Sequence, residues 1–205
     1  MSLIDKKRIP FRKVCDVLDK FKLKHVADLY NLKGNGVSEK EPGYLLHTET
    51  YFVDAPRKTV FNQYLQISPA KAWTNSRMDF ALMFDKNSGK IYYQDHDDFP
   101  AMEPNVLTIL NLHFFNRLLQ LSVGHEIELI DHEEYLIKSN YLESSVSRGS
   151  QFLRFFEDEP AKTRIVHDTY YKSDSKFRDR YIYPPAHTIT IGAFHANMKQ
   201  LILGK

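Results

Sequence analysis

The sequence predicts an α+β fold, in which an antiparallel sheet of about seven strands packs against one long C-terminal helix. Three observations predict it. An alternating segment near residue 50 is followed by two short helical segments. Four further alternating segments follow one another through short polar connections, as in an antiparallel meander. A helical stripe then runs almost to the end of the chain.

The composition is that of a globular chain rich in aromatic residues. Of its 205 residues, 42% are apolar and 26% are charged, and it contains 14 Phe, 12 Tyr and one Trp. Such side chains fill a large core or line a cavity. The net charge of +2 is too small to argue for a nucleic-acid partner. The one cysteine excludes an intramolecular disulfide. No signal peptide or integral membrane segment is visible, so we expect a cytoplasmic protein.

Residues 1–43 are predicted to form a helical extension that packs on a main body of residues 44–205. A helical stripe that includes Phe11, Val14 and Leu18 begins after Pro10. The loop "KGNGVSEKEPG" ends this helical part at residues 33–43.

The main body begins with a strand and two short helices. "YLLHTETYFV" at residues 44–53 alternates as a strand does. "DAP" follows, with Asp54 as the expected N-cap of a helix and Pro56 in its first turn. Ser68 and Pro69 are expected to begin the second helix.

The middle of the chain contains a hairpin and one ambiguous segment. "MDFALMFD" and "KIYYQDHD" flank a turn in which Gly89 can adopt the positive φ of a hairpin. Residues 104–121 are apolar for too long to form an exposed strand. We predict a helix that Pro104 begins, although a buried strand over 106–114 fits almost as well. "HEIELIDH", "EYLIKSNYLE", "SQFLRFFED" and "KTRIVHDTYYKS" then supply the four strands of the meander.

The last segment, "AHTITIGAFHANMKQLILG", fits two periods. Residues 186–192 alternate like a strand, but the helical stripe extends over 16 residues and ends at Gly204. Pro185 suits a first helical turn, and the residues after Gly192 are mostly good helix formers. The sequence therefore predicts a helix, whose stripe contains His187, Ile191, His195, Met198 and Ile202.

This order of elements resembles the helix-grip fold of the START-like (SRPBCC) superfamily, which includes polyketide cyclases, coenzyme-Q-binding proteins and the birch-pollen-allergen family. The matching stretches are "TETYFVDAPRKTVFNQYLQISPAKAW", "GHEIELIDHEEYLIKSNYLE" and "KTRIVHDTYYK". The resemblance covers residues 44–203, and the N-terminal helix, residues 104–121 and "SDSKFRDRYIYPP" are additional to it. It implies a curved sheet that grips the C-terminal helix, with an apolar cavity between them and no universal catalytic residue.

Metal-binding and catalytic motifs are missing from the sequence. None of the nine histidines has the i, i+4 spacing of helical metal ligands. No nucleophile motif, phosphate-binding loop or dinucleotide fingerprint occurs. We therefore expect no metal and no cofactor, and we assign no catalytic residue. Whether the chain is an enzyme stays open.

The candidate ligand-binding residues are pocket residues. They comprise aromatic side chains of the strands and the first helical region, two residues of the last strand and the stripe of the C-terminal helix: Trp73, Phe80, Phe84, Tyr93, Tyr141, Phe155, His167, Tyr170, His187, Ile191, His195 and Met198. The histidines would orient a polar group in an apolar cavity, or they would only bond backbone carbonyls at the rim of a filled core.

Three functions compete at this point. The first is binding or transport of a small hydrophobic ligand, such as a lipid, an isoprenoid or a polyketide-like compound. The second is a cyclase or aromatase whose acid or base is His167, Tyr170, His187 or His195. The third is an interaction module with a filled core that docks a partner, or a second copy in a homodimer, through residues 104–121. That segment could instead form a lid on the cavity.

Overall fold

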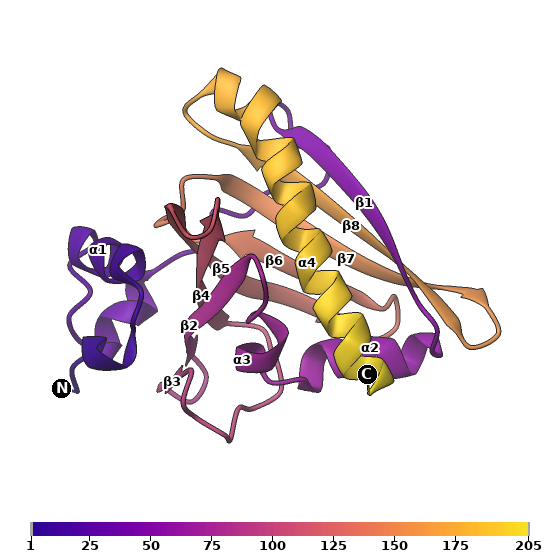
Figure 1. Ribbon diagram of the computed structural model, residues 1–205, viewed down its shortest axis with the longest axis horizontal. Helices are drawn as coiled ribbons and strands as arrows, with labels where there is room; N and C mark the ends of the chain where they lie inside the picture. The colour runs from indigo at the N-terminus through magenta and orange to yellow at the C-terminus, as the bar shows by residue number, and fades with distance from the viewer. Residues whose placement is uncertain (1, 205) are drawn as a thin grey trace.

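The computed structural model describes residues 2–204 and contains one eight-stranded antiparallel sheet (Figure 1). The strand order is β1-β8-β7-β6-β5-β4-β2-β3, and every neighbouring pair is antiparallel. The strands are β1 (Leu45–Val53), β2 (Met78–Asp85), β3 (Lys90–Tyr93), β4 (Val106–Phe114), β5 (Leu119–Asp131), β6 (Leu136–Tyr141), β7 (Arg148–Glu159) and β8 (Lys162–Lys172). The predicted α+β class is confirmed, with one strand more than expected.

The C-terminal segment is helical, as its longer stripe predicts. Helix α4 (Tyr183–Leu203) continues from the short helix η3 (Arg178–Ile182) and crosses one face of the sheet (Figure 1). Two prolines lie in its first turn, where no N–H is needed. Gly204 ends it in the left-handed conformation, with φ of 65°. Residues 186–192 therefore contribute turns of this helix and not a strand.

The two short helices lie where the sequence predicts them, at one end of the sheet. They are α2 (Arg57–Gln66) and α3 (Pro69–Ala72). The N-cap of α2 is Pro56, so the expectation that Asp54 caps it is wrong. The carboxylate of Asp54 instead lies 3.2 Å from the Lys199 ammonium, which joins the start of α2 to α4.

Residues 104–121 form no helix. They contain strand β4, a turn, and the beginning of β5, with Phe114 paired to Leu119. The strand alternative over 106–114 is correct. It reads as a continuous apolar run because both faces of β4 are buried. Val106 and Leu110 pack on the side of α4, whereas Leu107 and Ile109 pack on the opposite side.

The N-terminal segment covers that opposite side, which we call the outer face. It contains η1 (Lys6–Arg8), α1 (Arg12–Lys20) and η2 (Val26–Asn31), and it lies beside β2 and β4, apart from α4 (Figure 1). Fully buried Val14, Leu18 and Leu29 join Leu82 and Leu107 in one apolar cluster. The face toward α4, which we call the inner face, is left for a separate core. In the part of the chain that the structure describes, no helix has the length and apolar character needed to cross a membrane.

Candidate functional site

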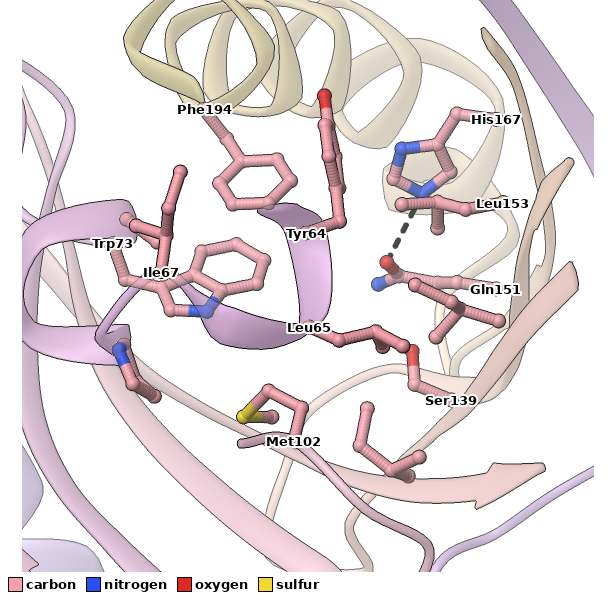
Figure 2. Close-up of a pocket in the computed structure, with 14 residues that line it drawn as sticks. Tyr64, Leu65, Ile67, Trp73, Met102, Ser139, Gln151, Leu153, His167 and Phe194 are labelled. Carbon is pink, nitrogen blue, oxygen red and sulfur yellow. Dashed lines mark hydrogen bonds between the residues drawn. The ribbon is translucent and has the colours of Figure 1, made fainter. Parts of the chain in front are cut away.

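A cavity of about 60 Å³ lies between α4 and the inner face of the sheet (Figure 2). Its walls come from α2, α3, β5, β6, β7, β8 and α4, so segments from most of the main body meet there. Most lining side chains are apolar, among them Leu65, Ile67, Ile127, Ile137, Leu153 and Phe194. Polar side chains reach it on one side, where Figure 2 shows Ser139, Gln151 and His167 together.

Trp73 closes the apolar side of the cavity. Its ring stacks on Phe194 of α4, with centroids 3.9 Å apart and planes inclined by 10°. A short helix precedes it, because Ser68 and Pro69 begin α3 and Trp73 ends it. The amide of Asn197 donates to the carbonyls of Lys71 and Ala72 at 2.8 and 2.9 Å, which fastens α3 to α4. The half-buried Trp73 is therefore held over the cavity by α4.

A chain of five polar side chains, of which four are buried and His125 is half-buried, runs along the other side. Gln151 Oε1 can only accept, so His167 donates to it from Nε2 at 3.0 Å (dashed in Figure 2). His167 Nδ1 then accepts from His195 Nε2 at 3.0 Å, and His195 Nδ1 accepts from the Tyr64 hydroxyl at 2.8 Å. The Gln151 amide donates to His125 Nε2 at 3.0 Å. We call these five residues the buried relay. All its bonds run in one direction, and each of these groups has a partner.

Burial keeps the histidines of the relay neutral. It lowers the pKa of His125 to about 4 and, with smaller contributions from His125 and His47, the pKa of His167 to about 3. Burial also holds the pKa of His195 well below the usual range of histidine, and it raises the pKa of Tyr64 well above the usual range of tyrosine. The polar side of the cavity therefore has no charge at pH 7. It can exchange hydrogen bonds with a neutral group, but it offers no counter-ion to an acid or an amine.

His187 lies about two helical turns before His195 on α4 and is not part of the relay. Its ring stacks on Tyr183, with centroids 4.9 Å apart, and meets the edges of His47 and His167. Both ring nitrogens are buried, and neither bonds any atom of residues 2–204. Burial holds its pKa well below the usual range. An imidazole of this kind loses hydration without gaining a hydrogen bond.

Two of the twelve residues predicted from the sequence line the cavity, namely Trp73 and His167. A second group surrounds it in the inner core: His195 belongs to the relay, Phe155 and Met198 pack in the cluster of Phe194, and Phe80 packs beside Trp73. The Tyr141 ring lies on His125, and its hydroxyl bonds that of Tyr183 at 2.5 Å. Ile191 and His187 are buried on α4.

Phe84, Tyr93 and Tyr170 lie on the outer face and do not line the cavity. Phe84 and Tyr93 pack under the N-terminal segment. A β-bulge explains Phe84: the register of β2 against β4 shifts between Phe80 and Leu82, which reverses the alternation beyond it. Phe80 and Phe84 therefore point to opposite faces, although an unbroken strand would align them.

Tyr170 follows the same rule of alternation without a bulge. It lies edge-on to Phe152 on the outer face, whereas its neighbour Tyr171 stacks on Tyr183 of the C-terminal helix. Tyr170 therefore lies away from the cavity in which the sequence places it as an acid or base.

The sequence analysis missed Tyr64, Ser139 and Gln151. Gln151 had a usable signal, because it shares a strand face with Leu153 and Phe155, and a polar side chain on an apolar face usually has a specific partner. Tyr64 has no signal of its own, because it shares the apolar side of α2 with Val60, Phe61 and Leu65. Ser139 has no such signal, since serine is common in strands of every kind. Within residues 2–204, no three His, Cys, Asp or Glu side chains lie close enough together to hold a metal ion.

The architecture is similar to that of solved START-like structures at low sequence identity. Norcoclaurine synthase from Thalictrum flavum, solved in complex with dopamine and hydroxybenzaldehyde, gives a TM-score of 0.56 at 12% identity, over 82% of this chain and 95% of that one. The KanY protein gives 0.56 at 9%, over 78% and 98%. Ara h 8.0201 gives 0.51 at 11%, over 80% and 100%. No protein-family model and no curated protein matches the sequence. The chain has the START-like helix-grip fold, as the resemblance implies.

Proposed function

We propose that the protein binds a small, largely apolar molecule between α4 and the inner face of the sheet. The observation that carries this proposal is the composition of the cavity, which has apolar walls and a few polar groups that converge on one side. The same fold holds small aromatic compounds elsewhere, since the norcoclaurine synthase structure contains dopamine and hydroxybenzaldehyde.

The volume implies that the ligand enters by displacing side chains. Cavities that hold drug-sized ligands measure roughly 300–1,000 Å³, whereas this one measures about 60 Å³. The movable parts of the wall are the half-buried Trp73 ring, which can turn while α3 stays fastened to α4, and the Met102 side chain, which lies in the loop before β4. A lipid or an isoprenoid would require both to move.

The neutral relay selects for an uncharged polar group on the ligand. A hydroxyl or carbonyl can exchange hydrogen bonds with Ser139 or Gln151, but a carboxylate would enter a site in which no lining side chain carries a positive charge. The ligand class that fits best is therefore an aromatic or alicyclic compound with one hydroxyl or carbonyl group.

Binding fits the relay better than acid–base catalysis does. Both ring nitrogens of His167 are already bonded, one to His195 and one to Gln151. A pKa of about 3 also makes its imidazole a weak base at neutral pH. The relay thus holds His167 and Gln151 in fixed orientations, which serves recognition of a ligand.

Trp73 provides the test, because it is the only tryptophan of the chain and lies in the cavity wall. We expect 2-naphthol to change its fluorescence saturably and 2-naphthoate, a carboxylate of similar shape, to bind at least about tenfold more weakly. Gln151→Leu should weaken 2-naphthol binding, whereas Gln66→Leu, on the exposed side of α2, should not. Equal binding by all three proteins, or no saturable change with either compound, would contradict the proposal.

A further inference from the structure

A second hollow, of about 420 Å³, lies at the end of the sheet where β2 begins and β4 ends. Its walls are two short segments, residues 75–77 and residues 113–117. They share no lining residue with the cavity under α4. The two segments are fastened together, because the His113 N–H donates to the Arg77 carbonyl at 2.9 Å. We call this hollow the strand-end hollow.

Its lining is polar and carries positive charge. Arg77 and Arg117 are both lining residues, together with Asn75, Ser76 and Asn116. Arg117 forms a bidentate ion pair with the buried carboxylate of Asp79, at 2.8 and 3.0 Å. The guanidinium of Arg77 pairs with no carboxylate of residues 2–204. One positive charge is therefore left without a counter-ion at the wall.

Two buried nitrogen atoms at this wall also lack hydrogen-bond partners among the described residues. They are Asn75 Nδ2 and His113 Nε2. The His113 residue is 6% exposed, and its Nε2 lies 3.6 Å from the nearest Asp79 oxygen, which is too far for a hydrogen bond. Buried groups of this kind normally have a partner, so the pair indicates a bound group that accepts hydrogen bonds.

The backbone of the second segment orients the wall. Phe115, Asn116 and Arg117 have φ values of 50°, 52° and 69°, which form a left-handed turn between β4 and β5. At the end of this turn the Arg117 guanidinium bonds the Asp79 carboxylate. The positive charge of Arg117 therefore neutralises the negative charge of Asp79 beside the hollow. The apolar ring of Phe114 completes the lining.

We propose that the strand-end hollow binds a phosphate group, with Arg77, Asn75 and His113 as its donors. A phosphate supplies several acceptor oxygens and the negative charge that Arg77 lacks as a partner. The hollow is larger than a phosphate alone needs, and Phe114 offers an apolar surface to an organic substituent. The ligand class is therefore an organic phosphate, which can be a free ester or the headgroup of a lipid.

The exposed side chains beside the hollow make the headgroup source testable. Phe115 is 74% exposed and Leu118 is 89% exposed on the turn that carries Arg117. These two apolar side chains would enter a lipid surface whose phosphates reached Arg77. A free phosphate ester offers no lipid surface, so Phe115 and Leu118 would not add to its binding.

The experiment measures binding of phenyl phosphate by calorimetry and binding to phosphatidylcholine vesicles, with and without phosphatidic acid, by co-sedimentation. Arg77→Gln should weaken binding at least about tenfold, the usual effect of removing a charge-assisted hydrogen bond. Arg12→Gln is the matched control, because Arg12 is an exposed arginine of α1 outside the hollow. His113→Phe removes a donor from a second wall, and we expect it to weaken binding as well.

Binding of phenyl phosphate that Arg77→Gln weakens would support a free ester as the ligand. Binding only to phosphatidic acid vesicles, weakened by the same variant, would support a headgroup. The proposal is wrong if wild-type protein binds neither probe. It is also wrong if Arg77→Gln binds as well as the wild type, or if Arg12→Gln loses as much as Arg77→Gln.

Discussion

The two faces of the sheet are covered by different chemistry. On the outer face, aliphatic side chains of the N-terminal segment pack against β2 and β4. On the inner face, α4 lies over aromatic rings, a small cavity and five polar side chains in one hydrogen-bonded chain. The outer face therefore contributes stability, whereas the inner face combines stability with a place where a ligand can bind.

The two faces should differ most in how acid affects the unfolding free energy, because the buried neutral histidines lie on the inner face. The pKa values of His125 and His167 in the folded protein are about 4 and about 3, below the unfolded value of about 6.5. As pH falls, the unfolded chain therefore takes up protons first, and stability is lost from about pH 6.5 down to about pH 4 for His125 and about pH 3 for His167. From pH 7 to pH 5 we expect a loss of about 2 kcal/mol for each of these two histidines, or about 4 kcal/mol together. The lowered pKa values of His187 and His195 add to this loss in the same direction.

Urea unfolding at the two pH values measures this loss. Carboxyl groups contribute little above pH 5, because their unfolded pKa values are about 4. An equal free energy of unfolding at pH 7 and pH 5 would contradict the buried, neutral relay.

Leu18→Ala tests the outer face. Leu18 is fully buried on the side of α1 that faces the sheet, so its truncation should cost about 3 kcal/mol of unfolding free energy. Binding of 2-naphthol to the folded protein should not change, because the outer core shares no residue with the cavity. Leu118→Ala, at an 89% exposed position, is the control and should cost less than about 0.5 kcal/mol. If Leu18→Ala lost 2-naphthol binding, the outer face would also support the ligand site, which would contradict the separate roles of the two faces.

Tyr64→Phe removes one end of the relay. His195 Nδ1 would then be buried without a donor, at a cost of about 2 kcal/mol. Tyr181→Phe, at an exposed tyrosine, should leave the unfolding free energy unchanged. If both variants unfold at the same denaturant concentration as the wild type, the Tyr64 bond contributes nothing to stability.

His187→Leu has the smallest expected effect and the opposite sign. Both ring nitrogens of His187 are buried without hydrogen bonds to residues 2–204, so an apolar side chain of similar size should stabilise the protein by about 1 kcal/mol. Thermal unfolding measures the change. Destabilisation of more than about 1 kcal/mol would mean that this imidazole has a partner in solution.

Most of the main body follows from local signals in the sequence. The stripe from His187 to Ile202 predicts α4, and proline and glycine mark its beginning and end. The β4 segment fails this method, since the N-terminal segment buries its second face and removes the alternation that identifies a strand. This burial depends on tertiary packing, so it cannot be predicted from the residues of the strand alone.

The site is less accessible to sequence reasoning than the fold. Trp73 and His167 are found because an aromatic residue after a short helix and a histidine on an inward strand face suit a cavity wall. Phe84 is misplaced because a bulge two residues earlier leaves no mark in the sequence. The contact between Tyr64 and His195 spans 131 residues, so only the folded chain brings the relay together.

A ¹H–¹⁵N spectrum of the histidine rings, recorded with and without 2-naphthol, tests most directly whether a ligand binds beside the relay. We expect neutral His167 and His195 rings that carry their proton on Nε2 at pH 7, and a shift of the His167 signals when 2-naphthol binds. The signals of His113, in the strand-end hollow, should stay in place. A charged His167, or 2-naphthol binding that leaves its ring signals unmoved, would contradict the inner-face site.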